Sequence, residues 1–469
     1  MPAHQEAPTH TVDVAVIGAG TAGLAAYRAA ALAGKRVLII EAGDYGTTCA
    51  RVGCMPSKLL LAAAEAAHHA RHARPFGVYA EVRVDGRDVM DRVRRERDRF
   101  VGFVVDGVDK IPAADKLRGR ARFVSPGVLA VGDTRVAAGS VVIATGSSPF
   151  VPPLFHALGD RLVVNDDVFA WEQLPESVAV FGAGVIGLEL GQALARLGVT
   201  VHVFGQNGGV GGIGDLAVKA VALAAFRREL TVDPDAKIQG VTRSEKGVDV
   251  RFTDEQGQVV TESFAYALVA AGRRPNLKDL GLENAGIPLN GGGAPVYEAA
   301  TLQCGDTSVF IAGDANDDVP LLHEAADEGK IAGDNAARFP NVRPGLRRSM
   351  LAIVFTDPQI AAAGTRFQDL PKDVVIGEVR FEDQGRARIM RQNHGLLRVY
   401  ADPATGRFLG AELAGPRAEN LGHLLAWAHQ EELTIERMLT MPFYHPVLEE
   451  GLRTALRDAQ SKLERNLSC

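Results

Sequence analysis

The clearest chemistry in this sequence lies in two closely spaced cysteines, Cys49 and Cys54. They are two of only four cysteines in the chain and stand in the segment GTTCARVGCMPSK, residues 46–58. With four residues between them, the sulfurs can come within disulfide distance if the segment bends at its start. Pro56 suits the first turn of a helix, and a thiol near a helix N-terminus is a better nucleophile because its thiolate is stabilised. The pair therefore favours a redox-active role.

Two other roles for these cysteines stay open at this point: a pair of buried structural thiols, or half of a zinc site. Zinc is disfavoured because no second Cys/His pair stands at ligand spacing. On the helix expected over residues 59–73, His68 and His72 share one face and could hold a metal. Because no carboxylate or third histidine is placed beside them, a solvated helix face is favoured, and we expect no metal site.

A strand, a glycine-rich turn, a helix and a second strand precede the cysteines. Residues 12–17 (VDVAVI) read as a buried strand and run directly into GAGTAG, an Ala-rich helix is expected over residues 22–33, and the strand RVLII ends at an acidic residue. Together they form a dinucleotide fingerprint: the glycines let the backbone approach a pyrophosphate at the helix N-terminus, and the carboxylate accepts from a ribose hydroxyl. The expected cofactor-binding residues are Gly18, Gly20, Gly23 and Glu41.

The same fingerprint returns later in the chain. VAVFG leads into GAGVIG, with Gly182, Gly184 and Gly187, and a helix and the strand VTVHVF follow. Two complete fingerprints predict two nucleotide-binding domains. The first glycine and the acidic residue are 23 positions apart in the first copy, but the same interval in the second copy reaches Gly205, and Gln206 follows it. With neither a carboxylate for a ribose 2′-hydroxyl nor an arginine for a 2′-phosphate, the sequence leans towards NAD and leaves NADP open.

Carboxylates stand at two further positions suited to chemistry. Asp314 follows the strand expected in VFIAGDAND and precedes a helix, where it suits a polyhydroxyl or ribityl chain or, alternatively, an ordinary helix cap. In MPFYHPVLEE, His445 precedes a proline, so it lies at a turn or a helix start, with Glu449 and Glu450 shortly after it. A histidine oriented by a carboxylate can act as an acid/base unit, and a capping role is the alternative.

Composition and charge limit the functional classes. The chain has 469 residues, which suggests about three domains at ~150 residues each. A net charge of −6 implies no basic face for nucleic acid, and the apolar runs are of strand length, too short to span a bilayer. The N-terminal MPAHQEAPTHT lacks a cationic segment followed by an apolar one, so we expect no secretory signal. In the reducing cytoplasm that we therefore expect, a close cysteine pair is more often catalytic than structural.

These segments, in this order, resemble the flavoprotein disulfide reductases, the pyridine nucleotide-disulfide oxidoreductase family that includes dihydrolipoamide dehydrogenase, glutathione reductase and mercuric reductase. The resemblance covers nearly the whole chain, with Thr47 where the cysteine motif usually has a second glycine. It implies an α/β fold with two Rossmann-like dinucleotide-binding domains, for FAD and NAD(P), and a C-terminal α+β dimerisation domain. The expected boundaries are 1–148 and 277–345 for the FAD domain, 149–276 for the NAD(P) domain and 346–469 for the dimerisation domain.

The resemblance also implies roles for individual residues. Cys49 would attack the substrate disulfide and Cys54 would lie next to the flavin. Lys58 would pair with Glu189 beside the flavin. His445 and Glu450 would form the acid/base pair contributed across a homodimer interface. The remaining cofactor-binding positions implied by the resemblance are Thr48, Thr145, Gly146, Gly272, Arg273, Gly313 and Asp314.

Within the family, the dihydrolipoamide dehydrogenase branch is favoured. Val185 stands where glutathione reductases carry a tyrosine lid, and His323 and HPVLEE resemble the dehydrogenase pattern, although Phe443 and Glu324 depart from it. Mercuric reductases lack the His–Glu pair and end in two adjacent cysteines, whereas this chain ends in a single, incidental Cys469, and soluble transhydrogenases lack the paired cysteines.

The activity implied by the resemblance is FAD-dependent oxidation of dihydrolipoamide, free or on a lipoylated carrier protein, with reduction of NAD⁺. One alternative is an NAD(P)H-dependent reductase of another disulfide, a quinone or a metal ion. A mainly structural flavoprotein subunit is the alternative from another class, and the presence of both cysteines together with His445 and Glu450 argues against it.

Overall fold

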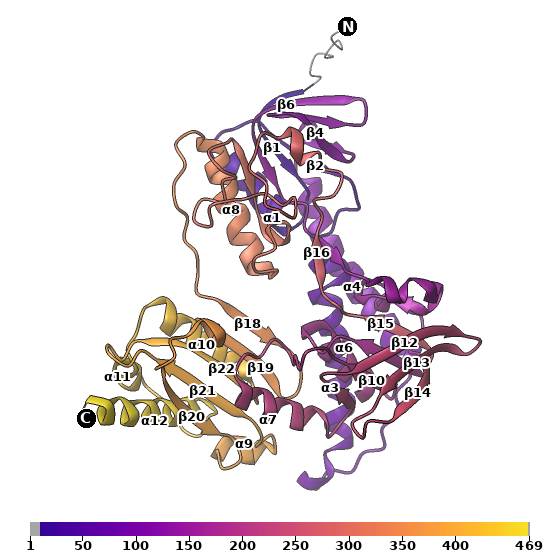
Figure 1. Cartoon of the computed structure of the whole chain (residues 1–469), viewed down its shortest axis with the longest axis vertical. Helices are drawn as coiled ribbons and strands as arrows, with labels where there is room; N and C mark the ends of the chain where they lie inside the picture. Colours follow the sequence, from indigo (N-terminus) through magenta and orange to yellow (C-terminus); the bar gives the residue numbers. More distant parts are fainter. Residues whose placement is uncertain (1–9, 468–469) are drawn as a thin grey trace. The chain divides into compact units, whose positions relative to one another are not determined.

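The computed structural model describes residues 10–467 (Figure 1). Residues 1–9, within the segment where no secretory signal is expected, and Cys469 lie outside the described residues. The chain divides into two compact units. The first combines Met1–Pro56, Arg95–Phe150 and Arg273–Arg347, and the second combines Ser57–Arg94, Val151–Gly272 and Arg348–Cys469. Helices α3 (Cys54–Arg71) and α4 (Gly86–Asp109) contribute residues to both units.

A mainly parallel sheet of the order β3-β2-β1-β6-β5-β4, with β17 beside β6, forms the first unit. Strand β1 lies between β2 and β6, is parallel to both, and is buried on both faces. Val14 and Val16 pack into the core on one face, while Ala15 and Ile17 pack into the core on the other. A central parallel strand covered on both faces reads as a nearly continuous apolar run. In residues 12–17 only Asp13 interrupts that run, which is why the strand was recognisable.

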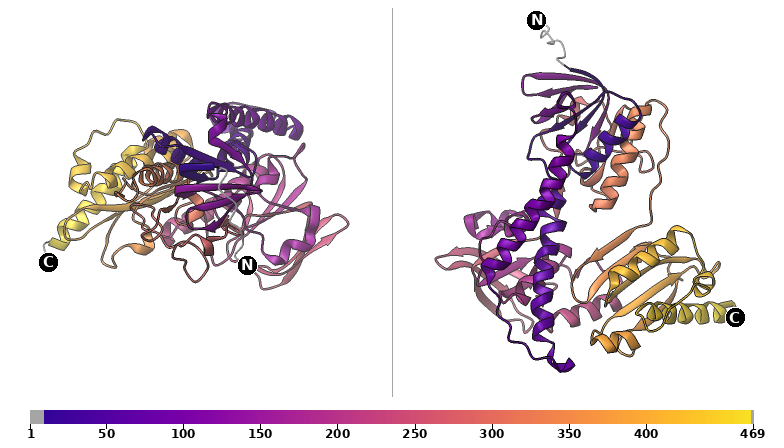
Figure 2. Two further views of the ribbon diagram at one scale, coloured as in Figure 1. Left: turned by 90° about the horizontal axis from the view of Figure 1, so that it is seen from above. Right: turned by 180° about the vertical axis from the view of Figure 1, so that it is seen from behind.

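The strands of this unit are β1 (His10–Ile17), β2 (Val37–Glu41), β3 (Lys116–Arg118), β4 (Ala121–Ser125), β5 (Val128–Val131), β6 (Thr134–Ile143), β7 (Ser147–Pro149), β16 (Arg273–Pro275) and β17 (Val309–Ile311). Helices α1 (Thr21–Leu32), α2 (Thr48–Val52) and α8 (Leu322–Arg338) accompany them. Helices α1 and α8 lie side by side (Figures 1 and 2). Two glycines of α8 permit this approach, because a Cβ on Gly329 or Gly333 would stand 2.2 or 2.4 Å from a carbonyl oxygen of α1.

The second unit contains another parallel sheet, of the order β11-β10-β9-β15-β8, and a three-stranded antiparallel sheet, β12-β13-β14. The parallel strands are β8 (Leu162–Val163), β9 (Ser177–Phe181), β10 (Thr200–Phe204), β11 (Thr231–Asp233) and β15 (Tyr266–Val269). The others are β12 (Lys237–Ser244), β13 (Gly247–Thr253) and β14 (Val259–Phe264), with helices α5 (Asn165–Val168), α6 (Val185–Arg196) and α7 (Leu216–Phe226). Both parallel sheets that the two fingerprints predicted are therefore present.

After residue 346 the same unit contains an antiparallel sheet, in the order β18-β19-β22-β21-β20. Its strands are β18 (Leu351–Val354), β19 (Gln359–Gly364), β20 (Val375–Arg380), β21 (Leu396–Ala401) and β22 (Phe408–Gly415). The helices are α9 (Gly385–Met390), α10 (Ala418–Gln430), α11 (Ile435–Leu439) and α12 (Glu449–Leu467). The α/β fold with a C-terminal α+β part is thus confirmed. Over the described range, no helix is both long and apolar enough to cross a membrane.

Candidate active site

The turn between β1 and α1 opens onto a cleft in the first unit. Gly18 has φ +106°, and a Cβ there would stand 2.3 Å from the Ala144 carbonyl oxygen. A Cβ on Gly23 would stand 1.8 Å from the Gly18 carbonyl oxygen, so both positions require glycine for the chain itself to pack. Gly20, by contrast, has no atom within 4 Å of its Cβ position. The free space lies at the N-terminus of α1, where a phosphate is bound best.

Polar groups line this cleft of about 510 Å³ in an arrangement that fits a dinucleotide. Both oxygens of the Glu41 carboxylate are held, since Oε2 accepts from Ala19 N and Oε1 from Gly43 N, each at 2.7 Å. Thr145 also lines the cleft, and its buried Oγ1 has no hydrogen-bond partner among the described residues. An unsatisfied buried hydroxyl is costly, so it points to a ligand that completes its hydrogen bonding.

Asp314 lies in the short helix η5 (Gly313–Asn316), directly after β17. Its Oδ2 accepts from Ser147 Oγ at 2.7 Å, and Arg273 donates to Ser147 Oγ at 2.8 Å. The structure thus brings together two predicted site residues through Ser147, which the sequence analysis did not single out. Ser147 comes directly after residues 144–146 (ATG), which follow β6. That position was the only feature of the sequence that could have indicated a role for Ser147.

The predicted glycines around these residues adopt backbone conformations that side chains rarely adopt. Gly146, Gly272 and Gly313 have φ values of +68°, +101° and +68°. Gly272 comes one residue before β16. Each marks a sharp turn after a strand of a nucleotide-binding domain, which is the structural reason for glycine there.

The cysteine segment forms the short helix α2 and the first turn of the longer helix α3. Thr47 caps α2, its Oγ1 accepting from Ala50 N at 3.3 Å, and its φ of +59° is one that the usual glycine would adopt without strain. Thr48 and Arg51 line the cleft, so the helix that carries Cys49 borders it. Cys49 is half-buried and Cys54, the first residue of α3, is exposed.

Cys49 and Cys54 are thiols in this structure, and they share a hydrogen bond. That hydrogen bond, followed by burial, raises the pKa of Cys49 well above the ordinary value for a thiol. The Cys49 thiol of the reduced pair therefore keeps its proton at neutral pH. The spacing of the two cysteines does bring their side chains into contact, as the sequence predicted.

Lys58 and Glu189 form a close ion pair, with Nζ and Oε2 2.7 Å apart. The other carboxylate oxygen accepts from Phe355 N at 2.8 Å, and the Lys58 ammonium lies 4.5 Å from the centre of the Phe355 ring. The side chain of Glu189 is almost completely buried, so its charge depends on these partners. The two residues that the family resemblance paired are paired here.

His445 and Glu450 also lie together, with Nδ1 3.0 Å from Glu450 Oε2. The hydrogen bond from His445 is the main cause that lowers the pKa of Glu450, and the Arg453 guanidinium lies 3.1 Å from the same carboxylate. The His445 side chain is 80% exposed, so the imidazole is accessible from outside its own chain. Phe443 stands where the family pattern has another histidine and lies under the Arg453 guanidinium, 5.6 Å from ring centre to cation.

In the second unit, the turn between β9 and α6 repeats the geometry of the first fingerprint. A Cβ on Gly182 would stand 2.3 Å from the Ala270 carbonyl oxygen, and a Cβ on Gly187 would stand 1.8 Å from the Gly182 carbonyl oxygen. Gly184 again faces open space. The repeated geometry fits a second dinucleotide.

One premise of the sequence analysis was wrong: two carboxylates, Glu229 and Asp357, do lie beside His68. Arg196 already binds both of them, donating to Glu229 at 2.7 Å and to Asp357 at 2.9 Å. Burial, followed by the charge of Arg196, lowers the pKa of His68 to about 4, so this histidine is neutral. Arg196 donates to both oxygens of Glu229 and to Oδ2 of Asp357, so these side chains form an ion-pair network.

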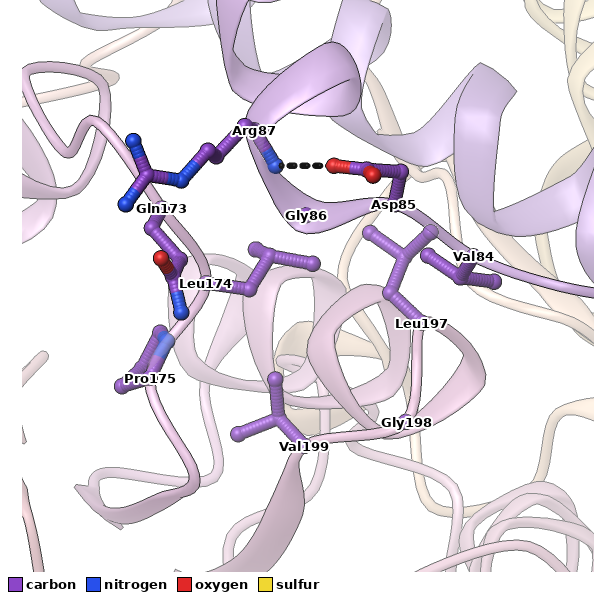
Figure 3. A pocket seen from close by; sticks show the side chains of 10 residues that line it. All are labelled: Val84, Asp85, Gly86, Arg87, Gln173, Leu174, Pro175, Leu197, Gly198 and Val199. Carbon is purple, nitrogen blue, oxygen red and sulfur yellow. Dashed lines mark hydrogen bonds between the residues drawn. The ribbon is translucent and has the colours of Figure 1, made fainter.

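Figure 3 shows a surface pocket of about 380 Å³ in the second unit, at the start of α4. Asp85 accepts from Arg87 N at 3.0 Å and so caps this helix. None of the predicted site residues lines this pocket, and its other lining side chains, from Gln173 to Pro175 and from Leu197 to Val199, are mostly apolar. The pocket therefore adds no group to the chemistry described above.

Comparison with known proteins agrees with this geometry. Residues 12–329 match the model of the pyridine nucleotide-disulphide oxidoreductases, and residues 350–456 match the dimerisation domain of that family. The chain is 32% identical to the dihydrolipoyl dehydrogenase of Halobacterium salinarum over 463 residues, which cover 95% of this chain and 96% of that protein.

Two solved structures share the fold. LpdA from Mycobacterium tuberculosis has a TM-score of 0.80 at 26% identity, with 95% of this chain and 99% of that chain covered. The HOCl-induced flavoprotein disulfide reductase RclA from Escherichia coli has a TM-score of 0.79 at 22% identity, with 95% and 98% covered. From these matches over nearly its whole length, the chain belongs to the pyridine nucleotide-disulphide oxidoreductase family.

Proposed function

We propose that this chain is an FAD-dependent dihydrolipoyl dehydrogenase, which oxidises dihydrolipoamide, free or on a lipoylated carrier protein, and reduces NAD⁺. The observation that carries the proposal is the contact between the thiols of Cys49 and Cys54. Helix α2, which contains Cys49, borders the cleft that fits a dinucleotide. The chain is 32% identical to a dihydrolipoyl dehydrogenase over 95% of its length, which supports this substrate over other disulfides.

FAD, when bound in the first cleft, supplies the two-electron acceptor for the reduced cysteine pair. Gly18, Gly20 and Gly23 would hold its pyrophosphate, and Glu41 would accept from its ribose. Asp314, held by Ser147, would bind the ribityl chain. Thr48, Thr145, Gly146, Gly313 and Arg273 complete the proposed FAD site. For Lys58 and Glu189, the family resemblance implies the role of an ion pair beside the flavin. The second fingerprint, with Gly182, Gly184, Gly187 and Gly272, would bind NAD.

These assignments divide the chain by role. Residues 1–148 and 277–345 make the proposed FAD domain, 149–276 the NAD domain and 346–469 the dimerisation domain. The match of residues 350–456 to the family's dimerisation domain supports a homodimer.

The thiol chemistry is an exchange of disulfides. A dihydrolipoyl thiolate attacks Cys49 of the oxidised pair, forming a mixed disulfide and releasing the Cys54 thiolate. The second lipoyl thiolate then displaces Cys49, so lipoamide leaves as a disulfide and the pair is reduced. In the reduced pair, the raised pKa of Cys49 keeps one proton on its sulfur.

His445 of a second subunit is the proposed base that takes the proton from each lipoyl thiol. The lowered pKa of Glu450 keeps its carboxylate ionised at neutral pH, so Glu450 holds Nδ1–H and leaves Nε2 to exchange the proton. The exposure of His445 supports a role outside its own chain.

The test replaces one thiol and keeps the cofactor. Cys49→Ser is expected to abolish dihydrolipoamide oxidation while the purified dimer keeps its FAD, measured by NADH formation and by the flavin absorbance. Cys304→Ala is the matched control, because burial raises the pKa of this core thiol to about 12 and keeps it unreactive. Dihydrolipoamide turnover that survives in Cys49→Ser would sink the disulfide mechanism, and a wild-type preference for NADPH with oxidised glutathione would redirect the substrate assignment.

A further inference from the structure

The adenosine end of the second fingerprint lacks the carboxylate that the first one has. In the first copy, Glu41 ends β2 and its Oε1 accepts from the backbone N–H two residues further on, that of Gly43, at 2.7 Å. The equivalent of Glu41, 23 residues after the first glycine, is Gly205 in the second copy. A family member that selects NAD by charge must therefore place its carboxylate in another way.

Gly205 cannot be replaced by an acidic residue in this fold. Its Cβ would stand 2.7 Å from the Pro234 carbonyl oxygen and 2.8 Å from Pro234 Cα. Strand β11 runs parallel to β10, with Asp233 opposite Phe204, and the chain that leaves β11 folds against the end of β10. Gly205 N donates to the Asp233 carbonyl oxygen at 2.6 Å. Pro234, which follows β11, therefore occupies the space that a side chain at position 205 would need.

The same neighbouring segment supplies a carboxylate. Asp235 Oδ1 accepts from Asn207 N at 3.0 Å, and Asn207 lies two residues after Gly205, as Gly43 lies two residues after Glu41. In both copies, therefore, a carboxylate accepts from the equivalent backbone N–H. In the first copy it belongs to Glu41, the last residue of β2, and in the second copy to Asp235, which follows β11. The other Asp235 oxygen is exposed and pairs with Lys237 at 2.8 Å.

We infer that Asp235 is the residue that selects NAD over NADP in this chain, with its carboxylate accepting from the adenosine ribose hydroxyls and repelling a 2′-phosphate. The inference rests on the proposed function, in which this domain binds a nicotinamide nucleotide. The segment that packs against Gly205 carries the carboxylates of Asp233 and Asp235 and the ammonium of Lys237. Asp235 also holds Lys237, the cation that a 2′-phosphate would otherwise recruit.

Ionisation supports this role. The hydrogen bond from Lys237 is the main cause that lowers the pKa of Asp235, so the carboxylate is charged at neutral pH. Gln206, which follows Gly205, has no positive charge to offset that repulsion of a 2′-phosphate.

The test is Asp235→Asn in the FAD-loaded dimer, with NADH and NADPH dissociation constants measured by fluorescence titration. Asparagine keeps an oxygen for Asn207 N, so the turn is preserved and only the charge is lost. NADH should bind several-fold more weakly and NADPH about tenfold more tightly, as expected when a charged acceptor is lost and a repulsion is relieved. In D235N/K237Q the gain for NADPH should be smaller than in D235N, because the relief of repulsion remains but the released ammonium no longer adds to it.

Asp254→Asn is the matched control, since this exposed carboxylate also accepts from backbone N–H groups, at the turn between β13 and β14, without being near the fingerprint in sequence. It should leave both dissociation constants unchanged. A ratio of NADH to NADPH affinity in D235N within twofold of the wild-type ratio overturns the inference, while dihydrolipoamide oxidation with NAD⁺ in the wild type would leave the proposed function intact. A wild-type dimer that binds neither nucleotide overturns both.

Discussion

Replacing Glu328 by leucine should weaken both the fold of the first unit and the binding of FAD at the site proposed there. Glu328 lies on α8, is 1% exposed, and none of its partners is close to it in sequence. Its Oε2 accepts from Gly313 N and from Asn316 Nδ2, both at 2.8 Å, and its Oε1 accepts from Arg347 Nη1 at 2.7 Å. One buried carboxylate thus fixes both ends of η5, the short helix that presents Asp314.

The expected cost follows from what each partner loses. Leucine leaves the Gly313 N–H buried without an acceptor, which costs about 1–3 kcal/mol, and removes two further hydrogen bonds. Arg347 is 27% exposed and keeps Glu324 at 3.5 Å and Asp318 at 3.8 Å, so the loss of its bond to Glu328 contributes little to the fall in the free energy of unfolding. We expect the free energy of unfolding to fall by about 3–4 kcal/mol in Glu328→Leu.

Glutamine separates these effects. With its amide oxygen at the Oε2 position, Glu328→Gln still accepts from Gly313 and Asn316, but its NH₂ group faces the Arg347 guanidinium. The loss is then one charged hydrogen bond, about 1–2 kcal/mol. Because Gly313 keeps its acceptor, η5 should stay in place, and the glutamine variant should retain FAD while the leucine variant releases it.

Urea unfolding and the flavin-to-protein absorbance ratio after gel filtration measure the two effects. Glu324→Gln is the matched control: it lies on the same buried helix face and pairs with Arg347, but no hydrogen bond joins its side chain to η5 in the described structure. If Glu328→Leu loses less than about 1 kcal/mol and keeps FAD as the wild type does, the reasoning on buried hydrogen bonds is refuted.

Two further predictions concern protons. His445→Gln should slow dihydrolipoamide oxidation by about two to four orders of magnitude, while NADH oxidation by an artificial electron acceptor survives; an equal loss of both activities in steady-state assays would count against a base. Burial raises the pKa of Glu412 above its usual 4.5 although Gly214 N and Asp215 N donate to it, so the folded state holds this proton more tightly than the unfolded state. The free energy of unfolding should therefore fall as pH rises from about 4.5 through the folded pKa, and Glu412→Gln, which mimics the protonated form, should show a shallower fall in urea unfolding between about pH 5 and 7; an unchanged slope would contradict this.

The parts of the fold and site that the sequence predicted are those determined by neighbours along the chain. Glu41 ends a strand and binds the turn of its own fingerprint, and Cys49 contacts Cys54 across one short segment. Each of these contacts joins residues fewer than about 30 positions apart. The local hydrophobic pattern and the turn residues therefore suffice to predict the strands, helices and turns that carry them. Lys58 with Glu189 is the exception: only the family resemblance joined residues so far apart.

The parts that the sequence missed depend on contacts between distant segments. Glu328 reaches η5 because α8 packs beside it, and no local pattern distinguishes it from Glu324 on the same helix. The carboxylates beside His68 come from the ends of two other segments, and Arg196, which binds both, lies on a third. A search for ligand spacing inside one helix could not find them, because the spacing exists only in the folded chain.

The two fingerprints differ in what constrains their residues. Gly23 and Gly187 are required by their own turns, since a Cβ on either would stand 1.8 Å from a carbonyl oxygen of the same loop. The ribose carboxylate has no such constraint; any strand that ends at the same edge of the sheet can bring one to the same place. A fingerprint therefore predicts where a pyrophosphate binds more securely than which ribose is accepted. In this chain the phosphate turn occurs twice. The backbone N–H two residues after position 41 or 205 donates to Glu41 in the first copy and to Asp235, which follows the next strand, in the second.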